Sequence, residues 1–157
     1  MIPKAYRASV AGLAVGATAF VGIAINEGYR GTAYTPVPND VATIGFGTTK
    51  GVRIGDTITP TAALVRALGD VKEAADAVKR CVKVDLYPHE FDAYVSLTYN
   101  IGQGAFCKST LVKELNAGRY EEACKQVLRW DHFKGKPLTG LTKRRREEYN
   151  TCIGGML

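Results

Sequence analysis

The distribution of apolar residues changes along the chain, and its first feature is a long uncharged run near the N-terminus. Lys4 and Arg7 precede residues 8–25, and no charged side chain interrupts that run. Its eighteen residues approach the length that a helix needs to cross the hydrocarbon core of a bilayer. Because alanine and glycine make up half of the run, its summed insertion free energy is only about −3 kcal/mol.

We therefore expect residues 8–25 to form a weak, uncleaved membrane anchor. The positive charges before the run predict a cytoplasmic N-terminus, with the rest of the chain exported. Two alternatives stay open from the sequence. One is a signal peptide cleaved near the triplet Ala17-Thr18-Ala19, and the other is a helix buried in a soluble core.

Residues 26–58 have a different pattern. They are rich in glycine, threonine, valine and tyrosine, and turn-forming residues recur at Pro36, Pro38 and Gly51. Short β-branched and aromatic segments between such turns are typical of strands. The pattern predicts a small β-hairpin region.

From residue 59 onward, apolar residues recur at helical spacing. Thr59-Pro60 predicts an N-cap and a first-turn proline for a helix that ends near Cys81 and breaks at Gly69-Asp70. Further helices are expected over residues 88–101, 111–117, 120–130 and 142–152. The helix over 88–101 should bury one face, which consists of Phe91, Tyr94, Val95, Thr98 and Ile101.

Together these patterns predict an α+β fold. An N-terminal segment, residues 1–25, precedes one domain, residues 26–157. Within that domain we expect a β-rich lobe over 26–58 and a larger helical lobe over 59–157. A chain of 157 residues can bury a core of this size without covalent cross-links.

The charge balance points to an anionic partner. The chain carries a net charge of +6, which suits nucleic acid, anionic lipid or an anionic wall polymer. Six basic residues and no acidic ones lie between Lys134 and Arg146. This stretch is either a solvated helix face or a surface that attracts the wall. No nucleic-acid-binding module surrounds it, so we expect no nucleic-acid partner.

The four cysteines, Cys81, Cys107, Cys124 and Cys152, have no paired spacing that is typical of a metal site. We expect no metal. Buried thiols and two disulfides are both consistent with the spacing. Because export would place the domain in an oxidising compartment, we predict two disulfides, with the pairing open among three possibilities.

A candidate for chemistry stands directly after the apolar run. Glu27 is followed by Gly28 and Tyr29. Desolvation beside apolar and aromatic groups favours the neutral form of a carboxyl group, and a general acid needs that form near neutral pH. Taken alone, Glu27 fits a solvent-facing carboxylate at a helix end better.

The segments around Glu27 change that interpretation, because together they resemble one family. The matching pieces, in order, are Glu27-Gly28, Ala33-Tyr34, Thr43-Ile44-Gly45-Phe46-Gly47, Asn100-Ile101-Gly102, Ser109-Thr110-Leu111, Leu115-Asn116-Ala117-Gly118 and Gly140-Leu141-Thr142-Lys143-Arg144-Arg145. They resemble the phage lysozymes of glycoside hydrolase family 24 over most of the chain. The weak anchor further resembles signal-anchor-release endolysins.

The resemblance implies a lysozyme-like fold with a cleft between the two lobes, and a muramidase that cleaves the β-1,4 bond between N-acetylmuramic acid and N-acetylglucosamine in peptidoglycan. Glu27 matches the family's general acid, and Thr43 matches a threonine that holds water on the opposite face of the sugar, as in an inverting glycosidase. The family's aspartate position is Pro36 in this chain. We therefore predict that Asp40, the nearest carboxylate to Thr43, substitutes for it.

Three alternatives remain at this point. Thr43, together with Thr35, holds the water without a carboxylate; or the enzyme is a lytic transglycosylase with one acid and no water; or the chain is an inactive, membrane-anchored wall-binding protein. Tyr34, Asn100 and Arg145 are the expected substrate-binding residues. We expect no cofactor, a monomer, and an enzyme held in the host inner membrane through residues 8–25 before its release to the periplasm.

Overall fold

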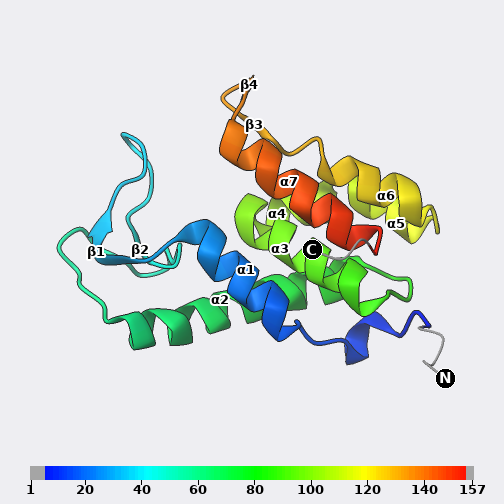
Figure 1. The fold of residues 1–157 in the computed structure, drawn as a ribbon, viewed down its shortest axis with the longest axis horizontal. Helices are drawn as coiled ribbons and strands as arrows, with labels where there is room; N and C mark the ends of the chain where they lie inside the picture. The colour runs from blue at the N-terminus through cyan, green and yellow to red at the C-terminus, as the bar shows by residue number, and fades with distance from the viewer. Residues whose placement is uncertain (1–5, 155–157) are drawn as a thin grey trace. The chain divides into compact units, whose positions relative to one another are not determined.

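The computed structural model describes residues 6–154 (Figure 1), and within them the chain divides into two compact units. One unit is Ala17–Glu73, here called the hairpin unit. The other combines the chain up to Gly16 with the chain from Ala74 onward, and is here called the helical unit. Mostly helical structure with small antiparallel sheets confirms the expected α+β class.

The hairpin unit begins with helix α1 (Ala17–Glu27), which leads into an antiparallel pair of strands. Strand β1 (Arg30–Tyr34) pairs with β2 (Thr43–Gly45), so that Arg30 faces Gly45 and Tyr34 faces Thr43. An irregularity between these two pairs shifts the register. The predicted hairpin region is confirmed.

The uncharged run does not form one continuous helix. A short 3-10 helix, η1 (Val10–Gly12), is followed by irregular chain through Gly16 before α1 begins. Gly12 ends η1 and Gly16 directly precedes α1, and glycine lowers helix propensity at both positions. Across residues 6–154, no helix combines the length and apolar character that a membrane span requires. Lys4, part of the predicted charge signal, lies outside the described residues.

Helix α2 (Pro60–Cys81) is unbroken, so the break that we expected at Gly69-Asp70 is wrong. A helical glycine costs about 1 kcal/mol relative to alanine, and burial of Ala67 and Val71 in the same turns offsets that cost. The predicted N-cap is present, because the Ala62 amide donates a hydrogen bond of 3.3 Å to the Thr59 hydroxyl.

The helical unit contains five further helices, which are α3 (Pro88–Ile101), α4 (Gln103–Lys108), α5 (Thr110–Asn116), α6 (Tyr120–Val127) and α7 (Thr139–Cys152). Helix α3 packs against α7, and α5 packs against α6. The predicted buried face of α3 is confirmed at Phe91, Tyr94, Val95 and Thr98. A hairpin of β3 (His132–Phe133) and β4 (Lys136–Pro137), which the sequence pattern did not predict, precedes α7.

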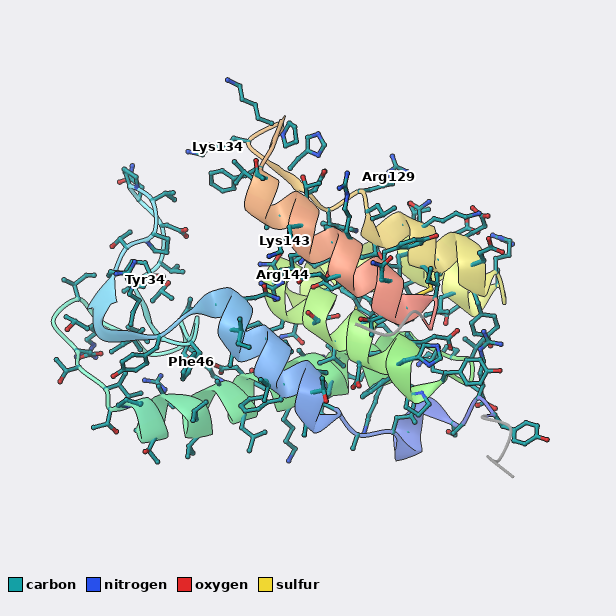
Figure 2. The ribbon with its side chains drawn as sticks, viewed as in Figure 1. Tyr34, Phe46, Arg129, Lys134, Lys143 and Arg144 are labelled. Carbon is teal, nitrogen blue, oxygen red and sulfur yellow. A yellow bond between two sulfur atoms is a disulfide. The ribbon has the colours of Figure 1, made fainter. Side chains whose placement is uncertain are left out.

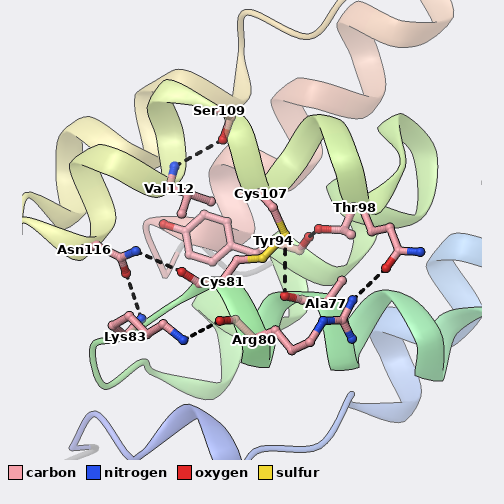
Figure 3. Close-up of a disulfide and its surroundings, with 11 residues drawn as sticks. Ala77, Arg80, Cys81, Lys83, Tyr94, Thr98, Cys107, Ser109, Val112 and Asn116 are labelled. Atoms are coloured by element: carbon pink, nitrogen blue, oxygen red, sulfur yellow. Dashed lines mark hydrogen bonds between the residues drawn. A yellow bond between two sulfur atoms is a disulfide. The ribbon is translucent and has the colours of Figure 1, made fainter.

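Two disulfides cross-link the helical unit. They confirm the prediction of two disulfides and establish which cysteines are paired. Cys81 at the end of α2 is bonded to Cys107 in α4 (Figure 3), and Cys124 in α6 is bonded to Cys152 in α7. Beside the first bond, Asn116 donates to the Cys81 carbonyl at 2.9 Å and accepts from the Lys83 amide at 2.7 Å. These two bonds fix the chain as it leaves α2.

Residues 7–16, here called the N-terminal strap, pack on the helical unit. The Arg7 guanidinium donates to both carboxylate oxygens of Glu90, at 2.7 and 3.1 Å. Ala8 and Leu86 exchange backbone hydrogen bonds of 2.8 and 2.9 Å. The Gly16 amide donates to Asp92 at 2.9 Å. Polar contacts therefore hold both ends of the strap.

Candidate active site

Glu27 is the last residue of α1, and the chain turns sharply after it. Gly28 adopts a φ of +67°, a conformation that favours glycine, and its amide donates to the Ala24 carbonyl at 3.0 Å. This helix ending leaves the Glu27 side chain half-buried at the start of the hairpin. The Glu27-Gly28 pair of the sequence thus places a carboxyl group where α1 meets β1.

The Glu27 carboxyl group lies against the backbone of Gly47. A Cβ atom at position 47 would lie 2.7 Å from Oε2 of Glu27 and 3.1 Å from its Cδ, and Gly47 also has a φ of +85°. Any other residue there would both strain the backbone and collide with the carboxyl group. The last glycine of the Thr-Ile-Gly-Phe-Gly segment is therefore fixed by its contact with the candidate acid.

Gly47 belongs to a closed turn over residues 44–48. The Ile44 amide donates to the Thr48 carbonyl at 2.9 Å, and the Thr48 amide donates back to the Ile44 carbonyl at 3.1 Å. At the tip of the turn, the Phe46 ring lies 5.6 Å from the ring of Tyr29. The two backbone hydrogen bonds close the turn at its base.

Thr43 lies one residue before this turn, in the same unit as Glu27. It is 6% exposed, and its hydroxyl donates to the Val41 carbonyl at 3.2 Å. With the hydroxyl proton directed at that carbonyl, the Thr43 oxygen has acceptor capacity left for a water molecule. Thr43 can therefore orient a water.

Tyr34 is paired with Thr43 across the two strands. Directly paired residues place their side chains on the same face of an antiparallel pair. The Tyr34 ring is partly exposed, and the Arg30 guanidinium lies 5.5 Å from its centre. Tyr34 (Figure 2) thus offers an accessible ring face and hydroxyl beside Thr43.

Asp40 lies on the exposed loop that joins the strands. Its amide donates to the Val37 carbonyl at 3.1 Å, which closes a turn, and its Oδ1 accepts from the Val41 amide at 2.8 Å. Asn39, just before it, has a φ of 65°, which asparagine tolerates better than most residues. The structure therefore places Asp40 three residues from Thr43 with one carboxylate oxygen engaged by its own turn.

In the helical unit, the two predicted residues Asn100 and Arg145 are brought together. Asn100 is exposed, and its side-chain oxygen accepts a hydrogen bond of 3.0 Å from Nη1 of Arg145. Arg145 is fully buried and also faces Glu148, with Nη2 to Oε1 at 3.0 Å and Nε to Oε2 at 2.8 Å. Because Arg145 is buried, it contacts Asn100 from the protein interior and orients the Asn100 side chain.

Glu148, the centre of this network, was not among the residues predicted from the sequence. Its Oε1 also accepts from Ser96 at 2.7 Å and from Arg144 at 3.2 Å. Burial raises the pKa of the Glu148 carboxyl group, and the charges of Arg145 and Arg144 oppose that rise. The signal in the sequence was the spacing of Glu148, three and four residues after two arginines on one helix.

The basic stretch between Lys134 and Arg146 divides accordingly. Arg144 and Arg145 are buried in ion pairs with Glu148. The exposed members are Lys134, Lys136, Lys143 and Arg146, and Figure 2 labels Lys134 and Lys143 on this unit. Within residues 6–154, no cluster of three or more His, Cys, Asp or Glu side chains is arranged to hold a metal ion.

A half-buried glutamate at a helix end lies against a glycine turn, and a buried threonine directly precedes that turn, which is the arrangement expected from the lysozyme resemblance. The family model described as Phage lysozyme matches residues 24–148, and the chain belongs to that family. The resemblance noted from the sequence is thereby confirmed. The chain is a glycoside hydrolase of the lysozyme type, and this family acts on peptidoglycan.

Individual relatives agree with this membership. The chain is 32% identical over 157 residues to the SAR-endolysin of Enterobacteria phage P21, covering 97% of this chain and 95% of that protein. It is 39% identical over 136 residues to the endolysin of Bacillus phage B103, covering 82% of this chain but only half of that protein. Among solved structures, the muramidase domain of SpmX from Asticaccaulis excentricus superposes with a TM-score of 0.82 at 30% identity, covering 90% of this chain and 98% of that one.

Proposed function

We propose that the protein is a phage endolysin that hydrolyses the β-1,4 bond between N-acetylmuramic acid and N-acetylglucosamine, with Glu27 as the general acid. The observation that carries the assignment is the close approach of Gly47 to the Glu27 carboxyl group. That approach restricts where the carboxyl group can point and removes water from one of its sides. A carboxyl group held in this way can deliver its proton to one glycosidic oxygen.

Water attack is assigned to Thr43 and Asp40. The Thr43 oxygen accepts a hydrogen bond from the water and orients it, while Asp40 removes the proton as the glycosidic bond breaks. In an inverting glycosidase the two carboxyl groups are separated by roughly 6.5–9.5 Å to leave room for that water. One oxygen of Asp40 is held by its turn, so the other acts as the base.

Sugar binding is assigned to Tyr34 and Asn100. Tyr34 offers an aromatic face and a hydroxyl, and the Asn100 amide offers a donor for a sugar oxygen. Arg145 contributes by holding the Asn100 side-chain oxygen. That contact turns the NH₂ group of Asn100 outward. The exposed Lys134, Lys136, Lys143 and Arg146 attract the anionic wall.

The assignment of the acid is tested by muropeptide analysis of wall digested with wild type, Glu27→Gln and Glu121→Gln. Glu121 is an exposed glutamate in α6 and serves as the matched control. Wild type and Glu121→Gln should release fragments with free reducing ends. Glu27→Gln should fold and release almost none, because an amide cannot protonate a leaving oxygen. Release by Glu27→Gln above a few per cent of wild type would contradict the assignment, and 1,6-anhydro ends would indicate a lytic transglycosylase.

We further propose that residues 1–25 anchor the protein in the host inner membrane, and that the catalytic domain, residues 26–157, becomes active as a monomer after release to the periplasm. The uncharged run over 8–25 and relatives named SAR-endolysin at 95–98% coverage of their length support this. In the anchored state Arg7 and Glu90 lie on opposite sides of the membrane. The strap contacts are therefore specific to the released enzyme.

A further inference from the structure

The turn that carries Gly47 is attached to one face of helix α2. Ala63 and Asp70 are seven positions apart, so two helical turns place them on the same side of that helix. A Cβ atom at Gly45 would lie 2.9 Å from Cβ of Ala63, so the turn rests directly on the helix. At the other end of the turn, the Thr48 hydroxyl donates a hydrogen bond to Oδ2 of Asp70.

Two contacts continue this attachment just after the turn. The Arg66 guanidinium donates to the Lys50 carbonyl at 2.7 Å, and the Lys50 ammonium pairs with Glu73 at 2.8 Å. Both of these contacts are exposed. By contrast Thr48 is 3% exposed. Its bond to Asp70 is therefore the contact that water replaces least readily.

The same turn also touches Glu27, at Gly47. The Glu27 carboxyl group occupies the place that a side chain of residue 47 would fill. Thr48 is the next residue, and its backbone is locked to Ile44 in both directions. A shift of the Thr48 side chain is therefore transmitted through one peptide unit to the surface that supports the carboxyl group.

We infer that Asp70 is a positioning residue for the general acid, because it fixes the turn over 44–48, and with it Gly47, against the Glu27 carboxyl group through Thr48. The inference rests on the proposed role of Glu27. Asp70 itself does not touch the sugar in this scheme. Proton delivery depends on the position of one oxygen, and a displacement of about 1 Å can lower a rate by about 10²-fold.

The test is a double-mutant cycle with Asp70→Ala, Thr48→Val and the double variant, assayed on soluble peptidoglycan fragments well below the melting temperature. Each single variant should lower kcat by about 10-fold or more, with KM nearly unchanged. The double variant should be no slower than the slower single variant, because both changes break the same bond. Asp70→Asn and Thr48→Ser keep an acceptor and a donor, and should retain most of the wild-type kcat.

Val71→Ala is the matched control for stability. Val71 is buried in α2 beside Asp70 but points to another face of the helix. If Val71→Ala lowers kcat as much as Asp70→Ala does, the effect is general destabilisation and the inference is wrong. Wild-type kcat in both Asp70→Ala and Thr48→Val would also overturn it. If Asp70→Ala does not fold, Thr48→Val, which replaces one hydroxyl by a methyl group, decides the question.

Glu27→Gln in the same assay separates the two claims. An active Glu27→Gln enzyme would overturn the proposed acid, and the positioning role with it. An inactive Glu27→Gln enzyme beside fully active Asp70→Ala and Thr48→Val enzymes would overturn only the role of Asp70.

Discussion

The ion pair between Arg7 and Glu90 should make a measurable contribution to the stability of the folded protein. Glu90 is 3% exposed and accepts two hydrogen bonds from the Arg7 guanidinium. The guanidinium also lies 3.6 Å from the centre of the Tyr120 ring. Arg7→Met keeps the apolar part of the side chain but leaves a buried carboxylate without its cation.

The magnitude follows from the burial of the two partners. Removing one member of a buried ion pair costs about 3–5 kcal/mol. The Arg7 side chain is 32% exposed, so water reaches part of the site and lowers the cost to about 2–3 kcal/mol. For a chain of this length each kcal/mol shifts Tm by about 2–4 °C, which predicts a fall of about 4–12 °C.

The assay is thermal unfolding of the purified, membrane-free protein, followed by circular dichroism. Lys50→Met is the control, because it removes an exposed ion pair with Glu73 and should leave Tm unchanged. Combining Arg7→Met with Glu90→Gln should recover part of the loss, since the unpaired charge is then gone. A Tm for Arg7→Met within about 1 °C of wild type would refute the reasoning.

Three further predictions concern the cross-links, pH and the anchor. Replacing Cys124 and Cys152 together by serine should lower the free energy of unfolding by about 3 kcal/mol, measured by urea denaturation; an unchanged midpoint would contradict it. Burial raises the pKa of the Asp92 carboxyl group, although the hydrogen bond from the Gly16 amide opposes that rise. The stabilising contribution of protonated Asp92 is therefore present in acid and is lost as pH rises through its folded-state pKa. Asp92→Asn should therefore raise Tm at neutral pH and have less effect at pH 3, in a melting series against pH. In the double variant Gly12→Leu, Gly22→Leu, each added Cβ atom meets open space, and the leucines should strengthen the proposed anchor. Cell fractionation should then find the variant in the membrane, with lysis delayed. Normal lysis by a fully membrane-bound variant would exclude release as the proposed trigger.

Local sequence signals predicted the elements whose formation depends on neighbouring residues. The Thr59-Pro60 start of α2 and the helical face of α3 depend on spacing and capping, and both are confirmed. The hairpin was predicted because turn residues interrupt β-branched segments. The glycines on either side of Phe46 were matched to a family motif. Their contacts with Ala63 and Glu27 can be seen only in the folded chain.

The errors arose where distant residues decide the local structure. Gly69-Asp70 reads as a helix break, yet Asp70 accepts a bond from Thr48, 22 positions earlier. Arg145 reads as an exposed basic residue, but Glu148 and Asn100 hold it inside the helical unit. The role of Asp40 remains a prediction. Asp40 lies in a loop, where no periodic pattern of residues indicates which way a side chain points.

The N-terminal strap also has a consequence for the order of events during synthesis. Arg7 is translated 83 positions before Glu90, and Gly16 is translated 76 positions before Asp92. At about 5–20 residues per second, the strap waits about 4–17 s before its partners leave the ribosome. Throughout that interval its apolar residues have no native surface to cover, and a nearby bilayer can accept them. The late appearance of its folding partners thus leaves the strap unpacked while the intervening chain is made.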